Sequence, residues 1–351
     1  MSWRHPASED PGMKGMGCEG TRAGASPRLS PAYWRLWWAT GVNAAGDGVF
    51  AAAVPLLAVT ITRDPRLVSV VSATAAQAIM PDIVAAPLLH TANGHQQTIT
   101  TLGSQFLGPP IGSLLFAVAV ALPFGMDAAS FALSAALLAV LPGCGRRRGE
   151  HPPMRTAIAD GLRWLVRHRL LRTLAVLLGV NTFCGHLGNA TLVLLATRTL
   201  GLDARGYGLL LAGAAAGSLL GGLAGARVVS RAGELPALLT GLAVNVVVFI
   251  GIGLSPNAIV LGTLLAVNGF VVTLWNIVTV SLRQQAVPSG MLGRVNGVYK
   301  MLGWGLIPLG ALAGGLVAHA LGLRAPYLVA GVLRGIVLLA AVSALRRCRT
   351  A

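Results

Sequence analysis

The sequence has little charge, almost no lysine and few cysteines. Only 11% of its 351 residues are charged and 54% are hydrophobic, whereas soluble domains carry about 25% charged residues. The four cysteines are scattered and lack the spacing of a metal site or a disulfide framework. There is no glycine-rich phosphate loop with lysine, no His/Glu metal motif and no nucleophile elbow. These absences argue against a soluble protein, an enzyme and an ATP-driven pump, and we expect neither a metal nor a cofactor.

Basic residues outnumber acidic residues by 27 to 11, which gives a formal net charge of +16. Such an excess is also found in nucleic-acid-binding proteins, but here the charges lie in loops between apolar spans, so we expect no nucleic-acid partner. Residues 1–33 are rich in glycine, proline, serine and charge, which predicts a disordered tail. The first apolar span starts near Trp34 and is longer than the apolar region of a signal peptide, so we expect no signal peptide.

Long apolar stretches follow this tail, and a membrane-spanning helix needs about 20 apolar residues. Such stretches occur at 36–62, 97–122, 124–142, 173–197, 207–230, 236–254, 257–282, 298–321 and 325–345. A weaker one at 67–89 is interrupted by Pro81, Asp82 and Pro87. The sequence therefore predicts an all-α membrane protein with about ten transmembrane helices. We expect a shortened helical half at 34–142, a basic linker at 143–172, a six-helix half at 173–346 and a tail at 347–351.

The basic residues are distributed unevenly across this topology. If the N-terminus is cytoplasmic, 21 of the 27 Lys and Arg residues lie in cytoplasmic segments, five in outside loops and one, Arg334, within the last span. This bias requires 67–89 to cross the membrane once. Because positive residues favour the cytoplasmic side, we expect a plasma-membrane protein with both termini and 143–172 in the cytoplasm. The sequence assigns no clear role to Arg334, which either bonds a backbone carbonyl or lies against the bundle.

The topology is testable by cysteine labelling in intact cells. A cysteine introduced within 146–155 should stay unlabelled by a membrane-impermeant thiol reagent, because we expect this linker to face the cytoplasm. A cysteine introduced at Arg205, in a loop expected to lie outside, serves as the labelled control. Strong labelling within 146–155 would show that the orientation is wrong.

The chain contains an internal repeat whose first copy is shorter. Val42-Asn43 and Val180-Asn181 each precede a Leu-Leu-Ala triplet at the same spacing, and later Gln-Ala, Pro and Asn-Gly landmarks recur in the same order. Ala58 and Ala78 are 20 residues apart, whereas Ala196 and Ala286 are 90 residues apart. The first half therefore lacks about 70 residues, which predicts the loss of two crossings. Repeated apolar halves are typical of secondary transporters, although so common a triplet also recurs by chance.

Several motifs, taken together and in order, resemble exporters of the major facilitator superfamily, in the branch of siderophore and macrolide efflux proteins. They are Trp37-Trp38, Gly46-Asp47-Gly48, Val54-Pro55-Leu56-Leu57, Ala76–Asp82, Ala92-Asn93-Gly94, Ser104-x3-Gly108-Pro109-x2-Gly112, Asp127–Phe131, Asp160–Leu165 with His168, Gln285–Pro288 and Arg294–Gly297. The resemblance covers about 34–345; within it, Ala92-Asn93-Gly94 resembles the loop after the family's fourth helix, and Asp160–Leu165 with His168 resembles the amphipathic stretch before its seventh helix. It implies a bundle of two pseudo-repeats that exports small molecules by proton antiport.

Two parts of this resemblance concern the gates of the transporter. Ser104, Gly108, Pro109 and Gly112 are similar to the fifth-helix motif of drug/proton antiporters, which implies a seal against proton leak. Packing of a kinked helix is the alternative. The family also has a Gly/Asp/Arg-rich cytoplasmic loop between its second and third helices, which clamps the two halves together. That loop is absent here, and its second-half counterpart is expected as a gate loop at Gly222, Arg227 and Arg231.

Two titratable residues are candidates for proton coupling. Asp47 lies well inside the first span, where an ionised carboxylate costs roughly 2.5–3.5 kcal/mol. Such surroundings favour the protonated form, which suits proton exchange. The repeat places Asp47 opposite Gly185, so His186 lies one position away in the pseudo-symmetric helix. The alternatives are structural: each side chain bonds a neighbouring helix.

Other amphipathic residues within the spans are expected to line a cavity of mixed polarity. The candidates are Asn43, Gln105, Asn181, Asn268, Trp275, Asn276 and Trp304. The expected function is proton-coupled efflux of small amphiphilic molecules across the lipid bilayer. Because the first half is shortened, the alternative is a transport-incompetent remnant or a membrane binding partner. The sequence names no substrate and indicates no oligomer.

Overall fold

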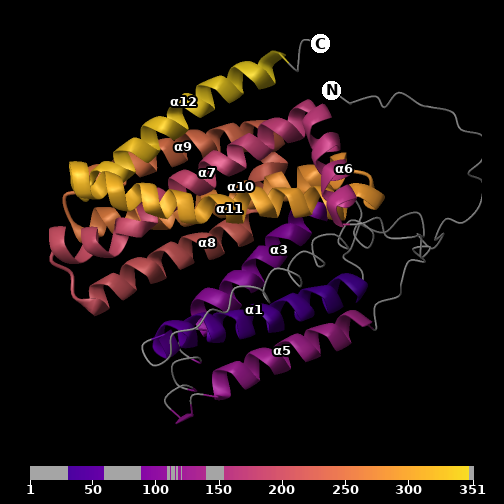
Figure 1. Ribbon diagram of the computed structural model, residues 1–351, viewed down its shortest axis with the longest axis horizontal. Coiled ribbons are helices and arrows are strands. Elements are labelled where there is room, and N and C mark those ends of the chain that lie inside the picture. Colours follow the sequence, from indigo (N-terminus) through magenta and orange to yellow (C-terminus); the bar gives the residue numbers. More distant parts are fainter. Residues whose placement is uncertain are drawn as a thin grey trace, which may run out of the picture.

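The computed structural model describes residues 31–58, 88–108, 121–139 and 154–347, with a few isolated positions between 111 and 119. In this part of the chain every regular element is a helix (Figure 1). The elements are α1 (Pro31–Ala58), α3 (Leu89–Thr101), the π-helical turn η2 (Leu102–Leu107), α5 (Leu122–Ala139), α6 (Met154–Arg167), α7 (Arg169–Leu194), the π-helical turn η3 (Leu195–Thr199), α8 (Ala204–Ala232), α9 (Glu234–Leu254), α10 (Ala258–Ala286), α11 (Ser289–Leu321) and α12 (Ala325–Arg347).

The helices form two groups that meet along α3. In one group α1 packs against α3, η2 and α5; in the other, α7 to α12 pack together, and α3 contacts α8 and α10 between the groups. Figure 1 shows α1, α3 and α5 together on one side of the molecule. Among the described residues, six helices are long and apolar enough to cross a membrane, from α7 with η3 through α12. The all-α membrane fold is thus confirmed, while the weak span 67–89 lies almost wholly outside the described residues.

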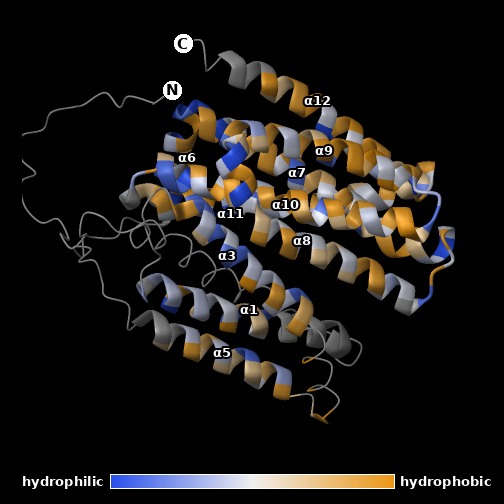
Figure 2. Ribbon diagram, turned by 180° about the vertical axis from the view of Figure 1, so that it is seen from behind, coloured by the Kyte–Doolittle hydropathy of each residue, from blue (hydrophilic) through white to orange (hydrophobic). Residues whose placement is uncertain are grey.

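Local sequence signals account for several helix ends. The Asp203 carboxylate accepts a hydrogen bond from the Gly206 N–H at 2.8 Å and caps α8, and Asn257 caps α10 through the Val260 N–H at 3.0 Å. α8 ends at Gly233, whose φ of 85° suits glycine better than any other residue. The helices between these polar ends are apolar. Figure 2 shows hydrophobic residues along α8 to α12 and hydrophilic ones gathered around α6.

The amphipathic stretch before the six-helix group forms α6, as expected. It packs against α11, where Arg294 Nη1 lies 3.2 Å from Asp160 Oδ2. Gly161 allows this approach, because a Cβ there would come within 2.9 Å of the Arg294 carbonyl oxygen. The helix therefore fastens the linker to the start of α11.

Two expected loops are helical instead. Ala92, Asn93 and Gly94 lie within α3, which begins at Leu89, earlier than the predicted span. The hydropathy of the sequence did not predict the start of this helix, because the segment contains many polar residues. Their side chains bond across the bundle rather than to water. The predicted gate loop at Gly222, Arg227 and Arg231 is also wrong, because α8 continues through Ala232 and the chain turns only at Gly233.

Small residues bring α8 and α10 into close contact. A Cβ on Gly217 would overlap the carbonyl oxygen of Ala266, and one on Gly269 would overlap that of Ala214. Glycine pairs of this kind let membrane helices approach until their backbones touch. We infer that van der Waals packing along this seam holds α8 against α10.

This packing predicts that Gly217→Ala destabilises the protein by about 1–3 kcal/mol, because the added methyl group must push the two helices apart. The matched control is Gly208→Ala on the same helix, where no described atom lies within 4 Å of the added Cβ. Thermal unfolding of the purified protein in detergent, followed by tryptophan fluorescence, measures the difference. Equal melting temperatures for the two variants would contradict the packing argument.

Candidate substrate cavity

A cavity of about 490 Å³ lies between the two groups of helices. Residues of α1, α3, α5, α7, α10 and α11 line it, so both groups contribute to its walls. Its size falls within the range of small-molecule sites, roughly 300–1,000 Å³. Its walls contain apolar side chains such as Leu36, Leu178 and Ile307 as well as amide, hydroxyl and charged groups.

Asp47 faces this cavity from α1. Asn43, one helical turn earlier, donates a hydrogen bond from Nδ2 to Asp47 Oδ2 at 3.0 Å. Behind them Gly46 packs against α5, where a Cβ would overlap the Ser130 hydroxyl and approach Asp127 Oδ1 within 3.0 Å. Asp127 on α5 thus lies beside α1 next to the position of Asp47. The structure thus adds a second membrane carboxyl group, which the sequence reading had treated only as part of a helix motif.

His186 lines the same cavity from α7. Thr182 and Leu178 precede it on the same helical face. His186 also marks where α7 meets α11, since its Cβ lies 3.2 Å from the position of a Cβ on Gly310. The structure therefore brings the two predicted titratable residues into one cavity from opposite groups of helices.

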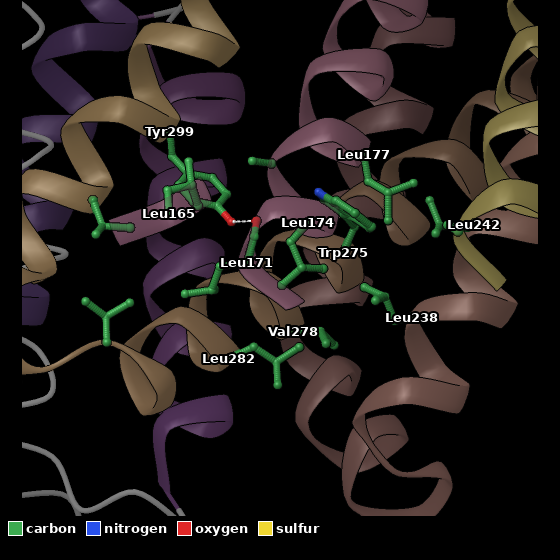
Figure 3. Close-up of a cluster of buried hydrophobic side chains, with 14 of the residues drawn as sticks. Leu165, Leu171, Leu174, Leu177, Leu238, Leu242, Trp275, Val278, Leu282 and Tyr299 are labelled. Carbon is green, nitrogen blue, oxygen red and sulfur yellow. Dashed lines mark hydrogen bonds between the residues drawn. The ribbon is translucent and has the colours of Figure 1, made fainter. Parts of the chain in front are cut away.

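The other predicted cavity residues divide into two sets. Asn43, Asn276 and Trp304 line the cavity, whereas Gln105, Asn181, Asn268 and Trp275 do not. Trp275 is buried in the apolar core of the second group, beside Leu174, Leu177 and Val278 (Figure 3). Gln105 is exposed on η2. Neighbouring residues 275 and 276 thus have opposite roles, because they point to different sides of α10.

Only part of the antiporter-type motif lies within the residues that the structure describes. Ser104 lies in η2 and donates its hydroxyl to the Thr100 carbonyl oxygen at 2.7 Å. Gly108 is buried and ends the π-helical turn, while Pro109 and Gly112 lie outside the described residues. The widened turn stands directly before Pro109 and Pro110, which have no N–H to continue an α-helical ladder. Gly103 lets this turn contact the α1 backbone at Ala44 and Ala45.

Hydrogen bonds join the two groups of helices at one end of the cavity. The Asn93 amide on α3 donates to Ser281 Oγ at 2.9 Å and to Gln284 Oε1 at 2.8 Å on α10. Nearby, His90 Nε2 lies 2.6 Å from Glu234 Oε1 at the start of α9. This end contains the starts of α1, α3 and α11 and the ends of α8 and α10. We call it the gate end, because these contacts hold the halves together there.

Two basic residues line the cavity near the gate end, and the sequence reading did not foresee them there. Arg283 on α10 exposes only 8% of its surface and stacks on Tyr299, with 4.3 Å between the guanidinium carbon and the ring centroid. Tyr299 is held by a 2.5 Å hydrogen bond to the Leu171 carbonyl oxygen (Figure 3). Lys300 follows Tyr299 on α11 and lines the same cavity. Arg283 follows Asn276 by two helical turns, and this spacing was the sequence signal that both residues lie on one face of the helix.

The structure also shows which groups bind the Arg334 side chain inside the last span. Its guanidinium lies inside the second group of helices, bonded to Asn245 Oδ1 and, at 2.9 Å, to the Asn181 carbonyl oxygen. The guanidinium carbon stands 3.7 Å from the centre of the Phe249 ring. Asn245 in turn donates to Asn268 Oδ1 at 2.9 Å. The bond from Asn245 holds the Asn268 side chain in this network, which ties α7, α9, α10 and α12 together.

Helices long and apolar enough to cross a membrane, with a cavity between two helical groups, are the arrangement expected of a multi-pass membrane transporter. The model of the Major Facilitator Superfamily matches residues 66–308, and the chain belongs to this family. No curated protein matches the sequence.

Solved structures of transporters share the fold. The human organic anion transporter MFSD10 (TETRAN) has a TM-score of 0.64 at 18% identity, over 88% of this chain and 81% of that one. A bacterial homologue of the iron transporter ferroportin, in its outward-facing state, has a TM-score of 0.60 at 18% identity, over 90% and 84%. A variant of the E. coli fucose:proton symporter FucP has a TM-score of 0.63 at 14% identity, over 89% and 84%. At these identities the likeness concerns the fold alone.

Proposed function

We propose that this chain exports small amphiphilic molecules in exchange for protons. The observation that carries the proposal is the position of Asp47, a membrane-embedded carboxyl group facing a cavity built from both halves of the bundle. Apolar walls with Trp304 and scattered amides fit a ligand that is partly apolar and partly polar. One solved relative of this fold is named a fucose:proton symporter, so proton coupling occurs within the fold.

The coupling follows from the cost of charge in the membrane. The ionised carboxylate of Asp47 is stabilised within the membrane because the Asn43 amide donates a hydrogen bond to it and the cavity admits water or substrate. Protonation removes this charge and with it the penalty for closing the cavity around an ion. We infer that Asp47 takes up a proton when the cavity opens outward and releases it when substrate enters from inside. His186, on the opposite wall, is the proposed partner in this exchange.

The proposal includes the finer features that the sequence predicts. We assign the chain to the siderophore and macrolide efflux branch and to the plasma membrane, with both termini and 143–172 in the cytoplasm. The bias of 21 among 27 basic residues supports this orientation. We further propose that residues 34–142 are a first half from which about 70 residues were lost relative to the second, as the spacings of 20 and 90 residues indicate.

A second candidate is a transport-incompetent form of the same fold, and the packing of α11 favours it. Leu309 and Leu312 on this helix expose 55% and 64% of their surface. No described atom lies within 4 Å of a Cβ added at Gly293, Gly297 or Gly305. Glycines in membrane helices usually mark close helix contacts. Among the described residues, these parts of α11 therefore lack close helix contacts, as a bundle missing helices from its first half would leave them.

Dye efflux distinguishes the two candidates. Cells that express the chain are loaded with an amphiphilic fluorescent dye, and a pH gradient is imposed across the membrane. Proton-coupled export predicts efflux that follows the gradient and stops when a protonophore collapses it. Efflux equal to that of cells with an empty vector, from protein shown to be present in the membrane, would instead support the transport-incompetent form.

A further inference from the structure

The basic residues at the gate end of the cavity have no acidic partner there. Among the described residues that line the cavity, Asp47 is the only acid, whereas Arg283, Lys300 and His186 are basic. Asp47 lies eleven residues after Leu36 on α1, which corresponds to about 16 Å along the helix. Lys300 precedes Gly310, the contact point of His186, by ten residues, or about 15 Å. Asp47 and His186 thus lie toward one end of the cavity, and Arg283 and Lys300 toward the other.

Arg283 is buried more deeply than an unpaired arginine is expected to be. It exposes 8% of its surface, its Nε has no hydrogen-bond partner among the described residues, and its guanidinium lies over the Tyr299 ring. A buried charge without a counter-ion is strongly unfavourable unless a partner is supplied. A guanidinium fork beside an ammonium group is the arrangement that carboxylates bind, often through two parallel hydrogen bonds.

We propose that Arg283 and Lys300 bind a carboxylate group of the substrate, so that the transported amphiphile is an organic anion. This inference rests on the proposed function, because it names the substrate class of the same cavity. The carboxylate lies at the gate end against Arg283 and Lys300, and the apolar part extends along Leu36, Ile307 and Trp304 toward Asp47.

The test compares two ligands that differ only in charge. The full chain is purified into nanodiscs of phosphatidylcholine, and isothermal titration calorimetry measures the binding of 1-naphthaleneacetate and of its neutral analogue 1-naphthaleneacetamide at neutral pH. We expect the acetate to bind at least tenfold more tightly than the amide. Arg283→Gln and Lys300→Gln should each bring this ratio close to one, while the affinity for the amide changes less than twofold.

Three further variants separate substrate binding from a structural role. Arg283→Lys keeps the charge and should retain part of the preference. Arg227→Gln removes an exposed charge of α8 that does not line the cavity, and should leave the ratio unchanged. If Arg283 only supports the fold through Tyr299, Arg283→Gln and Arg283→Lys would weaken both ligands equally, which would overturn the proposal.

The remaining outcomes concern the ligand. Tight binding of both compounds with equal affinity would refute the anion preference while leaving the cavity as a substrate site. Binding of neither compound would count against the proposed function itself, and the anion preference would fail with it. Loss of acetate binding when phosphatidylglycerol is added to the nanodisc would assign the basic pair to lipid headgroups, and the substrate proposal would be wrong.

Discussion

In any form of the chain that transports, Asp47→Asn is expected to abolish efflux driven by a pH gradient while leaving the amount of protein in the membrane unchanged. The amide has the shape of the carboxyl group and still accepts the hydrogen bond from Asn43, but it cannot release or bind a proton. A proton carries about 2.3 kcal/mol per 100 mV of membrane potential, so losing the carrier removes the driving force from the transport cycle. The measurement is the initial rate of dye efflux after a pH jump.

Two controls accompany this substitution. Asp203→Asn also replaces an acid by its amide, but Asp203 caps α8 outside the cavity and asparagine caps equally well, so efflux should persist. Asp127→Asn tests the neighbouring carboxyl group: a partial loss would make the two acids a coupled pair. Exchange of labelled for unlabelled dye without a gradient should survive in Asp47→Asn, because it needs the cavity but not the proton.

The shortened first half should lower the rate of dye efflux. We expect weak or undetectable efflux from the chain as it stands, and recovery when about 70 residues like those between Ala196 and Ala286 are restored, as the unequal spacings of 20 and 90 residues indicate. The substitution is therefore compared in both backgrounds. Strong efflux from the unaltered chain that survives Asp47→Asn would refute both the proton role and the transport-incompetent form.

The second large effect is expected at the buried arginine of the second group. Asn245→Ala removes one acceptor of the Arg334 guanidinium, which also bonds the Asn181 carbonyl oxygen, and should destabilise the protein by about 2–4 kcal/mol, because a buried charge then loses a hydrogen-bond partner. Adding Arg334→Met to this variant removes the charge and should restore most of the lost stability. Unfolding in detergent, titrated with a denaturing surfactant, measures these differences.

The matched control is Asn276→Ala, an amide on α10 that faces the cavity and bonds no buried charge. We expect its effect on stability to stay below about 1 kcal/mol. If Asn245→Ala is no less stable than this control, the guanidinium does not depend on Asn245. If the double variant is no more stable than Asn245→Ala alone, the loss comes from packing rather than from an unpaired charge.

Several features could be predicted from the sequence because they depend on neighbouring residues alone. Long apolar stretches predicted α7 to α12, since a helix in lipid must satisfy its own backbone. The amphipathic pattern of 160–168 predicted α6, and motif order identified the superfamily that the family match then confirmed. Asp47 was found because a charge inside an apolar span is conspicuous, and His186 because the repeat places it next to the position equivalent to Asp47; both line the cavity.

Which side of each helix faces the cavity was decided only by the tertiary structure. In a membrane helix both the lipid-facing and the core-facing sides are apolar, so hydropathy does not separate Trp275 in the core from Asn276 at the cavity. Arg283 and Lys300 counted in the sequence only as cytoplasmic charges, and α3 was hidden by polar residues such as Asn93. Contacts with residues far along the chain fix the positions of these side chains. Arg283 stacks on Tyr299, Asn93 bonds Ser281 and Gln284, and Arg334 bonds Asn245. Such partners lie far along the chain, so local sequence determines the helices, and packing between helices decides which of their residues form the site.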